Sequence, residues 1–197
     1  MIRNIWAVGR NYADHAKELG NEIPQEPMIF LKAGSCAFFG PEIPLPSWTQ
    51  EVHHEIELAL KFDAQLEISH FGLALDLTER KLQNHLKSKG QPWTIAKSFT
   101  SSCPLTQFHK ISTEAPLSLL HNLPLALNVN GEVRQLGSTQ QMIFSIEKLV
   151  SFVKAHFPVC PDDLLLTGTP AGVGPLFRGD RLVAQLGSLI QHEWIVI

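Results

Sequence analysis

The sequence lacks the features that mark secreted, membrane-spanning and nucleic-acid-binding proteins. Its 197 residues include only three cysteines, and no pair of them has C-x-x-C spacing. An odd number of cysteines without that spacing argues against a disulfide framework and a thiolate zinc site, and it fits a reducing cytoplasm. No apolar run is long enough to cross a bilayer, and the N-terminal one is too short for a signal peptide. The net charge of −3 forms no block, so neither nucleic acid nor a membrane is an expected partner.

Signatures of covalent catalysis and of phosphate binding are also missing. There is no G-x-S-x-G elbow, and Cys103 precedes Pro104 without a persuasive histidine companion. The glycine-rich stretch at 166–175 does not end in the Gly-Lys-Ser/Thr of a phosphate loop. We therefore expect one soluble, cytoplasmic domain that acts on a small molecule through activated water.

The hydrophobic pattern predicts more strands than helices. The strands expected from alternation or short apolar runs cover 28–31, 54–60, 71–75, 125–129, 132–136 and 164–166. Asn130-Gly131 joins two of them and is the strongest short-range hairpin signal in a sequence. Short helices are expected at 11–20, after the capping-box spacing of 76–79, and after a Ser145 cap. Strands and helices do not alternate as βαβ units, so the fold class is α+β, mainly β, and not a Rossmann fold.

Three carboxylates could form a metal site. In the strand 54–60, Glu55 and Glu57 lie on the face opposite Ile56 and Leu58, and Asp76 follows the apolar run 71–75. If these carboxylates converge, they offer the all-oxygen ligands that magnesium or manganese prefers. The alternative is a solvated strand face and a helix N-cap at Asp76, and the spacing alone favours this alternative.

Other polar residues could have either a catalytic role or an ordinary structural one. His15 and Glu18 are three residues apart, so they form either a base with its orienting carboxylate or a surface pair. Lys97 interrupts an apolar stretch and should either reach water or pair with a negative group. The Thr169 hydroxyl and nearby backbone N–H groups could hold a carboxylate. We leave the neighbouring imidazoles 53 and 54 outside the metal ligands, because adjacent strand residues point to opposite faces.

Six short motifs occur in order over nearly the whole chain: V-G-R-N-Y-A-D-H at 8–15, F-L-K at 30–32, H-H-E-I-E-L at 53–58, A-L-D-L-T at 74–78, G-Q-P-W-T-I-A-K-S-F at 90–99 and L-T-G-T-P at 166–170. Together they resemble the fumarylacetoacetate hydrolase family, which overturns the plain interpretation of the carboxylates. The resemblance implies a mixed β-roll with a few short helices, one catalytic domain over 1–197, and a homodimer.

The resemblance also implies roles for individual residues. Glu55, Glu57 and Asp76 match residues that bind Mg²⁺, with Mn²⁺ as a close substitute. His15 and Glu18 match a catalytic pair on a lid within 1–20, and Lys97 is a further catalytic residue. The implied substrate-binding residues are Arg10, Tyr12, Lys32, Gln83 and Thr169. One departure is the segment 61–70, which is about ten residues shorter than is usual in the family, so we expect a peripheral turn or helix to be missing.

The His-x-x-Glu pair resembles the small acylpyruvate hydrolase and oxaloacetate decarboxylase branch. Its expected reaction is hydrolysis of a 2,4-dioxo acid of the acylpyruvate or fumarylpyruvate type to pyruvate and a carboxylic acid. In it His15 activates water, Lys97 faces a developing oxyanion and Thr169 positions the carboxylate. Decarboxylation of oxaloacetate or isomerisation of a 2-oxo acid is the alternative, and a non-catalytic metal- or partner-binding protein is the second. The sequence does not distinguish these reactions.

Overall fold

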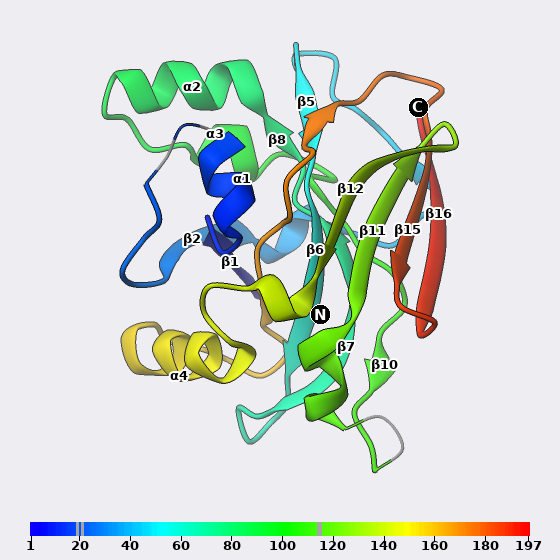
Figure 1. Ribbon diagram of the computed structural model, residues 1–197. Coiled ribbons are helices and arrows are strands. Elements are labelled where there is room, and N and C mark those ends of the chain that lie inside the picture. Colours follow the sequence, from blue (N-terminus) through cyan, green and yellow to red (C-terminus); the bar gives the residue numbers. More distant parts are fainter. Residues whose placement is uncertain (19, 21, 114–115) are drawn as a thin grey trace.

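The computed structural model describes residues 1–197 except 19, 21 and 114–115, and its largest element is a six-stranded sheet (Figure 1). In spatial order its strands are β10 (His109–Lys110), β7 (Ile68–Leu75), β6 (Ile56–Phe62), β13 (Leu164–Leu166), β1 (Asn4–Gly9) and β2 (Met28–Ala33). β1 and β13 are parallel, and the other neighbours are antiparallel. The sheet is therefore mixed, and it joins the first strand of the chain to one near its end.

A five-stranded sheet packs against the first one. Its order is β12 (Glu132–Ser138), β11 (Pro124–Val129), β15 (Arg181–Leu186), β16 (Ile190–Val196) and β4 (Glu42–Ile43). Apolar side chains of both sheets, such as Leu58 and Leu60 from β6 and Leu127 and Trp194 from the other sheet, form one buried cluster. This core of stacked sheets confirms the prediction of a mainly β, α+β fold.

Among the described residues, two small sheets and three 3-10 helices complete the connections. The strands are β5 (Val52–His54), β8 (Thr78–Glu79) and β14 (Gly174–Pro175) in one sheet, and β3 (Ala37–Phe38) with β9 (Cys103–Pro104) in another. The 3-10 helices are η1 (Gly34–Cys36), η2 (Leu117–Asn122) and η3 (Thr139–Gln141).

The described residues form four short α-helices, which lie outside the sheets (Figure 1). They are α1 (Ala13–Glu18), α2 (Arg80–Ser88), α3 (Thr94–Lys97) and α4 (Ile146–His156). The Ser145 side chain caps α4 by accepting from the Lys148 N–H, as predicted. Within the described residues, no helix is long and apolar enough to cross a membrane.

Three local expectations differ from the structure. The N-cap of α2 is Glu79, whose carboxylate accepts from the Leu82 N–H, and not Asp76, which lies before β8. The strand 54–60 is not half-buried, because β6 is covered on both faces and only Lys61 in it is partly exposed. A strand at the centre of a sandwich with helices outside loses the solvated face that alternation predicts. The expected helix at 11–20 is shorter, since α1 spans 13–18 and Leu19 falls outside the described residues.

The short segment after β6 is a tight turn. The Asp63 carboxylate accepts from the N–H groups of Gln65 and Glu67, and the Asp63 N–H donates to the Glu67 carbonyl. Residues 63–67 therefore join β6 to β7 directly. The two strands stay in register from Ile56↔Leu75 to Lys61↔His70, and a bulge next to the turn shifts the last pair to Phe62↔Ile68.

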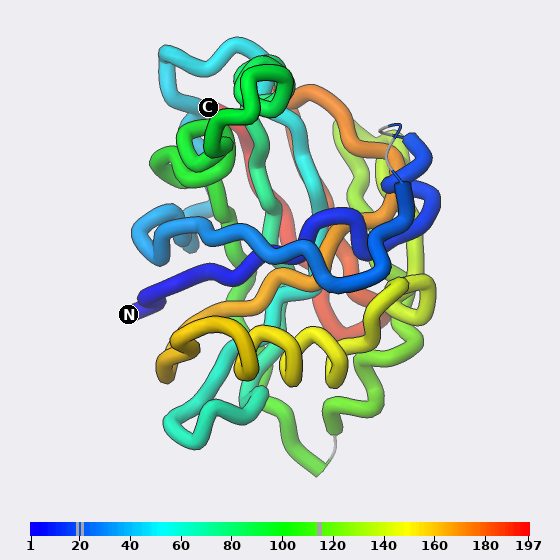
Figure 2. Tube along the Cα trace, turned by 90° about the vertical axis from the view of Figure 1, so that its left-hand side faces the viewer, coloured from blue at the N-terminus to red at the C-terminus, as the bar shows by residue number. Residues whose placement is uncertain are grey.

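The N-terminal strand is fixed to residues far along the chain. The buried Asp163 carboxylate accepts from the Asn4 N–H at 3.0 Å, the Trp6 indole N–H at 2.9 Å and the Cys160 N–H at 2.9 Å. The Asn11 side chain donates to the Thr167 carbonyl at 2.8 Å. Figure 2 shows the N-terminal segment, in blue, running beside β13, in orange.

Candidate active site

The register of β6 and β7 brings the three predicted carboxylates together. Glu55 lies between β5 and β6, Glu57 lies in β6, and Asp76 follows β7 directly. The Asp76 N–H donates to the Glu55 carbonyl at 2.8 Å, which fixes these two residues side by side. One carboxylate oxygen from each residue lies within 4.8 Å of the others, and all three residues are buried. A group of buried carboxylates needs cations to stabilise it.

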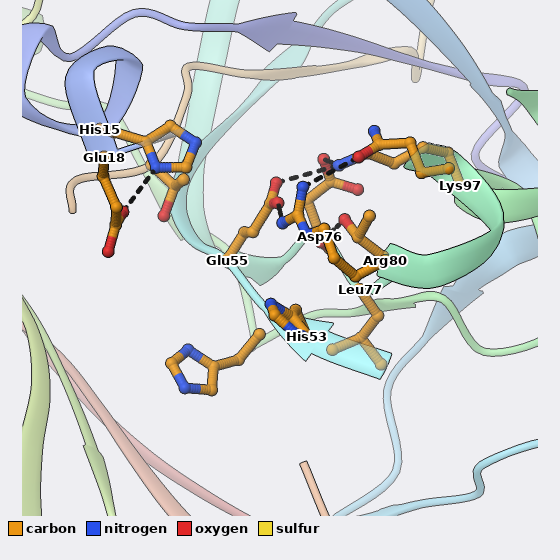
Figure 3. Close-up of polar contacts among 12 residues, drawn as sticks. His15, Glu18, His53, Glu55, Asp76, Leu77, Arg80 and Lys97 are labelled. Atoms are coloured by element: carbon orange, nitrogen blue, oxygen red, sulfur yellow. Dashed lines mark hydrogen bonds and ion pairs between the residues drawn. The ribbon is translucent and has the colours of Figure 1, made fainter. Parts of the chain in front are cut away.

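Three cationic side chains contact this cluster, and Figure 3 shows two of them, Arg80 and Lys97, beside Glu55 and Asp76. The Lys97 ammonium donates to Glu55 at 2.9 Å and to Asp76 at 2.6 Å, so the lysine has the negative partners that the sequence analysis allowed. The fully buried Lys32 donates to Asp76 at 2.8 Å and to the Lys97 carbonyl. Arg80, which the sequence analysis missed, pairs with Glu55.

The surroundings of Glu57 differ from those of Glu55 and Asp76. Within the described residues it has no ion-pair partner, and it accepts one hydrogen bond, from the Gly168 N–H at 2.6 Å. Burial, together with Asp76 and Glu55, raises the pKa of Glu57 well above its ordinary value. Burial also acts on Glu55, but Lys97 and Arg80 outweigh it and hold the pKa of Glu55 well below its ordinary value.

This donor set fits a divalent cation. Three carboxylates supply hard oxygen ligands at mutual distances suited to one ion, and a cation there would satisfy the charge of Glu57. Within the described residues, no other group of three His, Cys, Asp or Glu side chains lies close enough to hold a metal. His53 bonds to Glu51 and His54 to Gln135, so both imidazoles are engaged elsewhere.

A cleft opens above the carboxylates. Five residues singled out from the sequence line it with the three carboxylates: Arg10, His15, Gln83, Lys97 and Thr169. Seven residues without a predicted role also line it: Val8, Gly9, Met28, Phe30, Arg80, Lys87 and Trp93. Arg80, Gln83 and Lys87 lie at i, i+3 and i+7 of α2 and thus on one helix face, a spacing that could have been read from the sequence.

Two of the expected substrate-binding residues lie away from the cleft surface. Lys32 is behind it, because its ammonium is occupied by Asp76 and two backbone carbonyls. Tyr12 is buried, and its hydroxyl has no hydrogen-bond partner among the described residues. Burial, and then the charge of Glu57, raise the pKa of Tyr12. Both residues support the wall of the cleft from within.

His15 and Glu18 form a pair at the edge of the cleft, on the short helix α1. The Glu18 carboxylate lies 3.2 Å from His15 Nδ1, and His15 is buried while Glu18 is partly exposed. The same carboxylate accepts from the Gly172 N–H at 3.0 Å, which fastens α1 to the glycine-rich loop. Figure 3 shows this pair across a gap from Glu55. If Glu18 holds the proton on Nδ1, the other ring nitrogen, Nε2, is left as a base.

Thr169 is held by a residue that the sequence analysis missed. Gln135 of β12 is fully buried, and its amide donates to the Thr169 hydroxyl and to the Pro170 carbonyl, both at 2.8 Å. Its carbonyl oxygen accepts from the Ile56 N–H at 3.0 Å and lies 2.9 Å from His54 Nδ1. One side chain thus joins the glycine-rich loop to the strand that carries the two glutamates.

The arrangement can bind a cation and a small anion, and it places a base beside them. Residues 4–195 match the family described as Fumarylacetoacetate (FAA) hydrolase C-terminal, and the chain belongs to this family of enzymes. The resemblance read from the six motifs is thereby confirmed.

Particular relatives are similar over most of their length. The chain is 40% identical to "Oxaloacetate tautomerase FAHD1, mitochondrial" from Bos taurus, over 98% of this chain and 91% of the relative. It is 42% identical to "Oxaloacetate tautomerase YcgM" from Escherichia coli (strain K12), over 92% of this chain and 87% of the relative. A crystal structure of fumarylpyruvate hydrolase from Pseudomonas aeruginosa in complex with Mn²⁺ and pyruvate matches with a TM-score of 0.91, 32% identity, and coverage of 100% of this chain and 90% of that one.

Proposed function

We propose that this protein is a magnesium-dependent enzyme, active also with manganese, that forms the enol or enolate of a small 2-oxo acid. The observation that carries this proposal is the buried cluster of Glu55, Glu57 and Asp76 beneath a cleft with His15 at its edge. Glu55, Glu57 and Asp76 would hold the cation. When bound, it would supply a Lewis acid for the negative charge that develops on the 2-oxo oxygen.

The first candidate reaction is on oxaloacetate, as the names of the two curated relatives suggest. His15 Nε2 would take a proton from C3 and deliver it to the 2-oxo oxygen, or carry it in the opposite direction, which interconverts the keto and enol forms. Lys97 has three N–H donors, and two of them are engaged by Glu55 and Asp76. The third can face negative charge in the cleft. Loss of CO₂ from the same substrate needs no base, because the electrons of the C3–C4 bond remain on C3.

Hydrolysis of an acylpyruvate is the second candidate, and the His15–Glu18 pair favours it. Here His15 Nε2 would take the proton of a water molecule that attacks the C4 carbonyl, and Thr169 would help to bind the substrate carboxylate. The products would be pyruvate and a carboxylic acid. The non-catalytic alternative loses support, because the three carboxylates, His15, Lys97 and Thr169 line one cleft.

A direct assay separates these reactions. Chelator-treated protein is incubated with oxaloacetate or acetylpyruvate, with and without Mg²⁺, while the enol absorbance, CO₂, pyruvate and acetate are measured. Mg²⁺-dependent turnover of either substrate supports the proposal. If neither substrate is turned over with Mg²⁺ or with Mn²⁺, the proposal is overturned.

Replacement of His15, the proposed base, shows which of the reactions depend on it. His15→Ala should abolish enol–keto interconversion and hydrolysis, leave decarboxylation largely intact, and spare Mg²⁺ binding. His85→Ala is the matched control, since His85 lies on the outer part of α2 and does not line the cleft. Equal loss of all three reactions in His15→Ala would contradict the assigned role of His15.

A homodimer and a cytoplasmic location stay predictions. Val133 and Leu136 are 60% and 67% exposed on β12, at the edge of the five-stranded sheet. Exposed apolar side chains at a sheet edge are typical of a subunit contact. Light scattering after size-exclusion chromatography tests the dimer, and Val133→Lys with Leu136→Lys should dissociate it if this edge is the contact.

A further inference from the structure

Two cations at the mouth of the cleft have no acidic partner. Lys87 and Arg10 line the cleft, and among the described residues neither forms an ion pair. The deeper cations differ from them, because Lys32, Lys97 and Arg80 each contact a carboxylate. The deep part of the cleft is therefore neutralised by the protein itself, whereas its mouth carries uncompensated positive charge.

The neighbours of Lys87 keep its ammonium at the mouth. It comes from the last turn of α2, and its Nζ lies 4.9 Å from the centroid of the Trp93 ring, a cation–π contact. Lys87 is exposed overall, but its neighbours partly desolvate its ammonium, and this desolvation, followed by the positive charges of Arg80, Lys97 and Arg10, lowers the pKa of Lys87 to about 8. Glu55 acts in the opposite direction, but it is already paired with Lys97 and Arg80. The mutual repulsion of these cations would be relieved by an anion bound among them.

Two aromatic rings lie between the Lys87 and Lys97 ammonium groups, because Trp93 contacts Lys87 and the Phe30 ring centroid is 5.0 Å from Lys97 Nζ. Phe30 and Trp93 have ring centroids 5.7 Å apart, and both line the cleft. A ligand that fits this cleft would thus meet polar groups at both ends and aromatic rings between them. That pattern suits a short molecule with a charge at each end.

We propose that Lys87, together with Arg10, binds the second carboxylate of the substrate, so that the enzyme prefers 2-oxo diacids to 2-oxo acids with an uncharged acyl group. The inference rests on the proposed function for the placement of the first carboxylate near the metal site. A guanidinium can bind a carboxylate in a bidentate manner, and an ammonium adds a point charge beside it.

Binding of two unreactive acids tests this preference without turnover. Malate and lactate are both 2-hydroxy acids, and malate alone has a second carboxylate. Calorimetric titration with Mg²⁺ present should show that the unchanged protein binds malate at least about tenfold more tightly than lactate. Lys87→Met, which keeps the apolar stem, should reduce this preference to about twofold and leave lactate binding unchanged. Lys89→Met is the control, since Lys89 follows α2 but does not line the cleft.

The pH dependence gives a second, independent readout. Lys87 is charged below a pKa of about 8 and loses its charge above it, so the preference for malate should fall between pH 7 and pH 9 in the unchanged protein. Lys87→Arg keeps its charge at both pH values and should retain the preference. Arg80, Arg10 and Lys97 face the same space and are present in both proteins.

Each result bears on the proposal. A malate preference that Lys87→Met leaves intact, or an equal weakening of malate and lactate, would overturn it. The same fall of preference with pH in Lys87→Arg and the unchanged protein would also overturn it. Failure of the proposed function is distinguishable, because it would appear as no turnover of oxaloacetate and acetylpyruvate, whatever the binding data show.

Discussion

Replacement of Gln135 by leucine should remove stability and activity together, although Gln135 does not line the cleft. The side chain is fully buried and contacts four groups: His54, the Ile56 N–H, the Thr169 hydroxyl and the Pro170 carbonyl. Leucine has a similar volume and no polar atom. The change therefore leaves the shape of the site nearly intact while it removes every hydrogen bond.

The expected loss of stability comes from two backbone groups that Gln135 satisfies. His54 and Thr169 can rotate toward other partners, but the Ile56 N–H and the Pro170 carbonyl are fixed by the strand and the loop. Each unsatisfied buried group costs about 1–3 kcal/mol, so the free energy of unfolding should fall by about 2–6 kcal/mol. The Thr169 hydroxyl also loses the partner that orients it, so turnover should fall by more than the folded fraction does.

Urea unfolding measures the first effect. The midpoint should fall at an unchanged m-value, which shows that stability and not the exposed surface has changed. Gln185→Leu is the matched control. Gln185 lies on β15 of the same sheet, and among the described residues its side chain bonds only to Gln191 at the surface, so the loss of stability should stay within about 0.5 kcal/mol. A loss for Gln135→Leu no greater than that of the control would refute the reasoning.

Three further changes have definite expected outcomes. Glu57→Gln should weaken Mg²⁺ binding at least about tenfold in calorimetry, because it removes one of three anionic ligands, yet it should not lower the melting temperature of the metal-free protein. Asp163→Ala should cost about 3–5 kcal/mol in urea unfolding, because it leaves buried N–H groups unpaired; a loss near zero would show that water replaces the carboxylate. Gly172→Ala should lower turnover, because its φ is +98° and a Cβ would lie 1.9 Å from the Arg134 carbonyl, which forces the loop away from Glu18. Steady-state kinetics with unchanged values would contradict this last expectation.

The elements predicted well from the sequence depend on local chemistry. The hairpin at Asn130-Gly131 forms because both residues adopt the positive φ that its turn requires, 54° and 84°. Ser145 caps α4 through its own side chain. The alternation at 54–60 put Glu55 and Glu57 on one face, but only the pairing of β6 with β7 brings Asp76 to them, and a single sequence contains no signal for that register.

Gln135 shows why other parts could not be predicted. A strand alternation of 132–138 places apolar Val133 and polar Gln135 on the same face, yet Val133 is exposed and Gln135 is buried. The cause is a break in register: Leu127 pairs with Gln135 and Asn128 with Val133, which leaves Arg134 as the extra residue of a bulge. A bulge turns the following side chains to the other face, and its position depends on both strands. The pairing of Arg80 with Glu55 is likewise a tertiary contact.

The pairing of β1 with β13 has a consequence for how this chain is made. Strand β1 leaves the ribosome long before its parallel partner at 164–166 and its anchor Asp163 are synthesised. Contacts of such long sequence separation form slowly, because the intervening chain must first be closed into a loop. His15 near the start and Thr169 near the end line the same cleft, so no N-terminal fragment that stops before residue 169 can contain a complete site. During synthesis, one edge of β1 therefore stays unpaired until β13 is made. Of all forms of this protein, the nascent chain is thus the most exposed to aggregation and to chaperones.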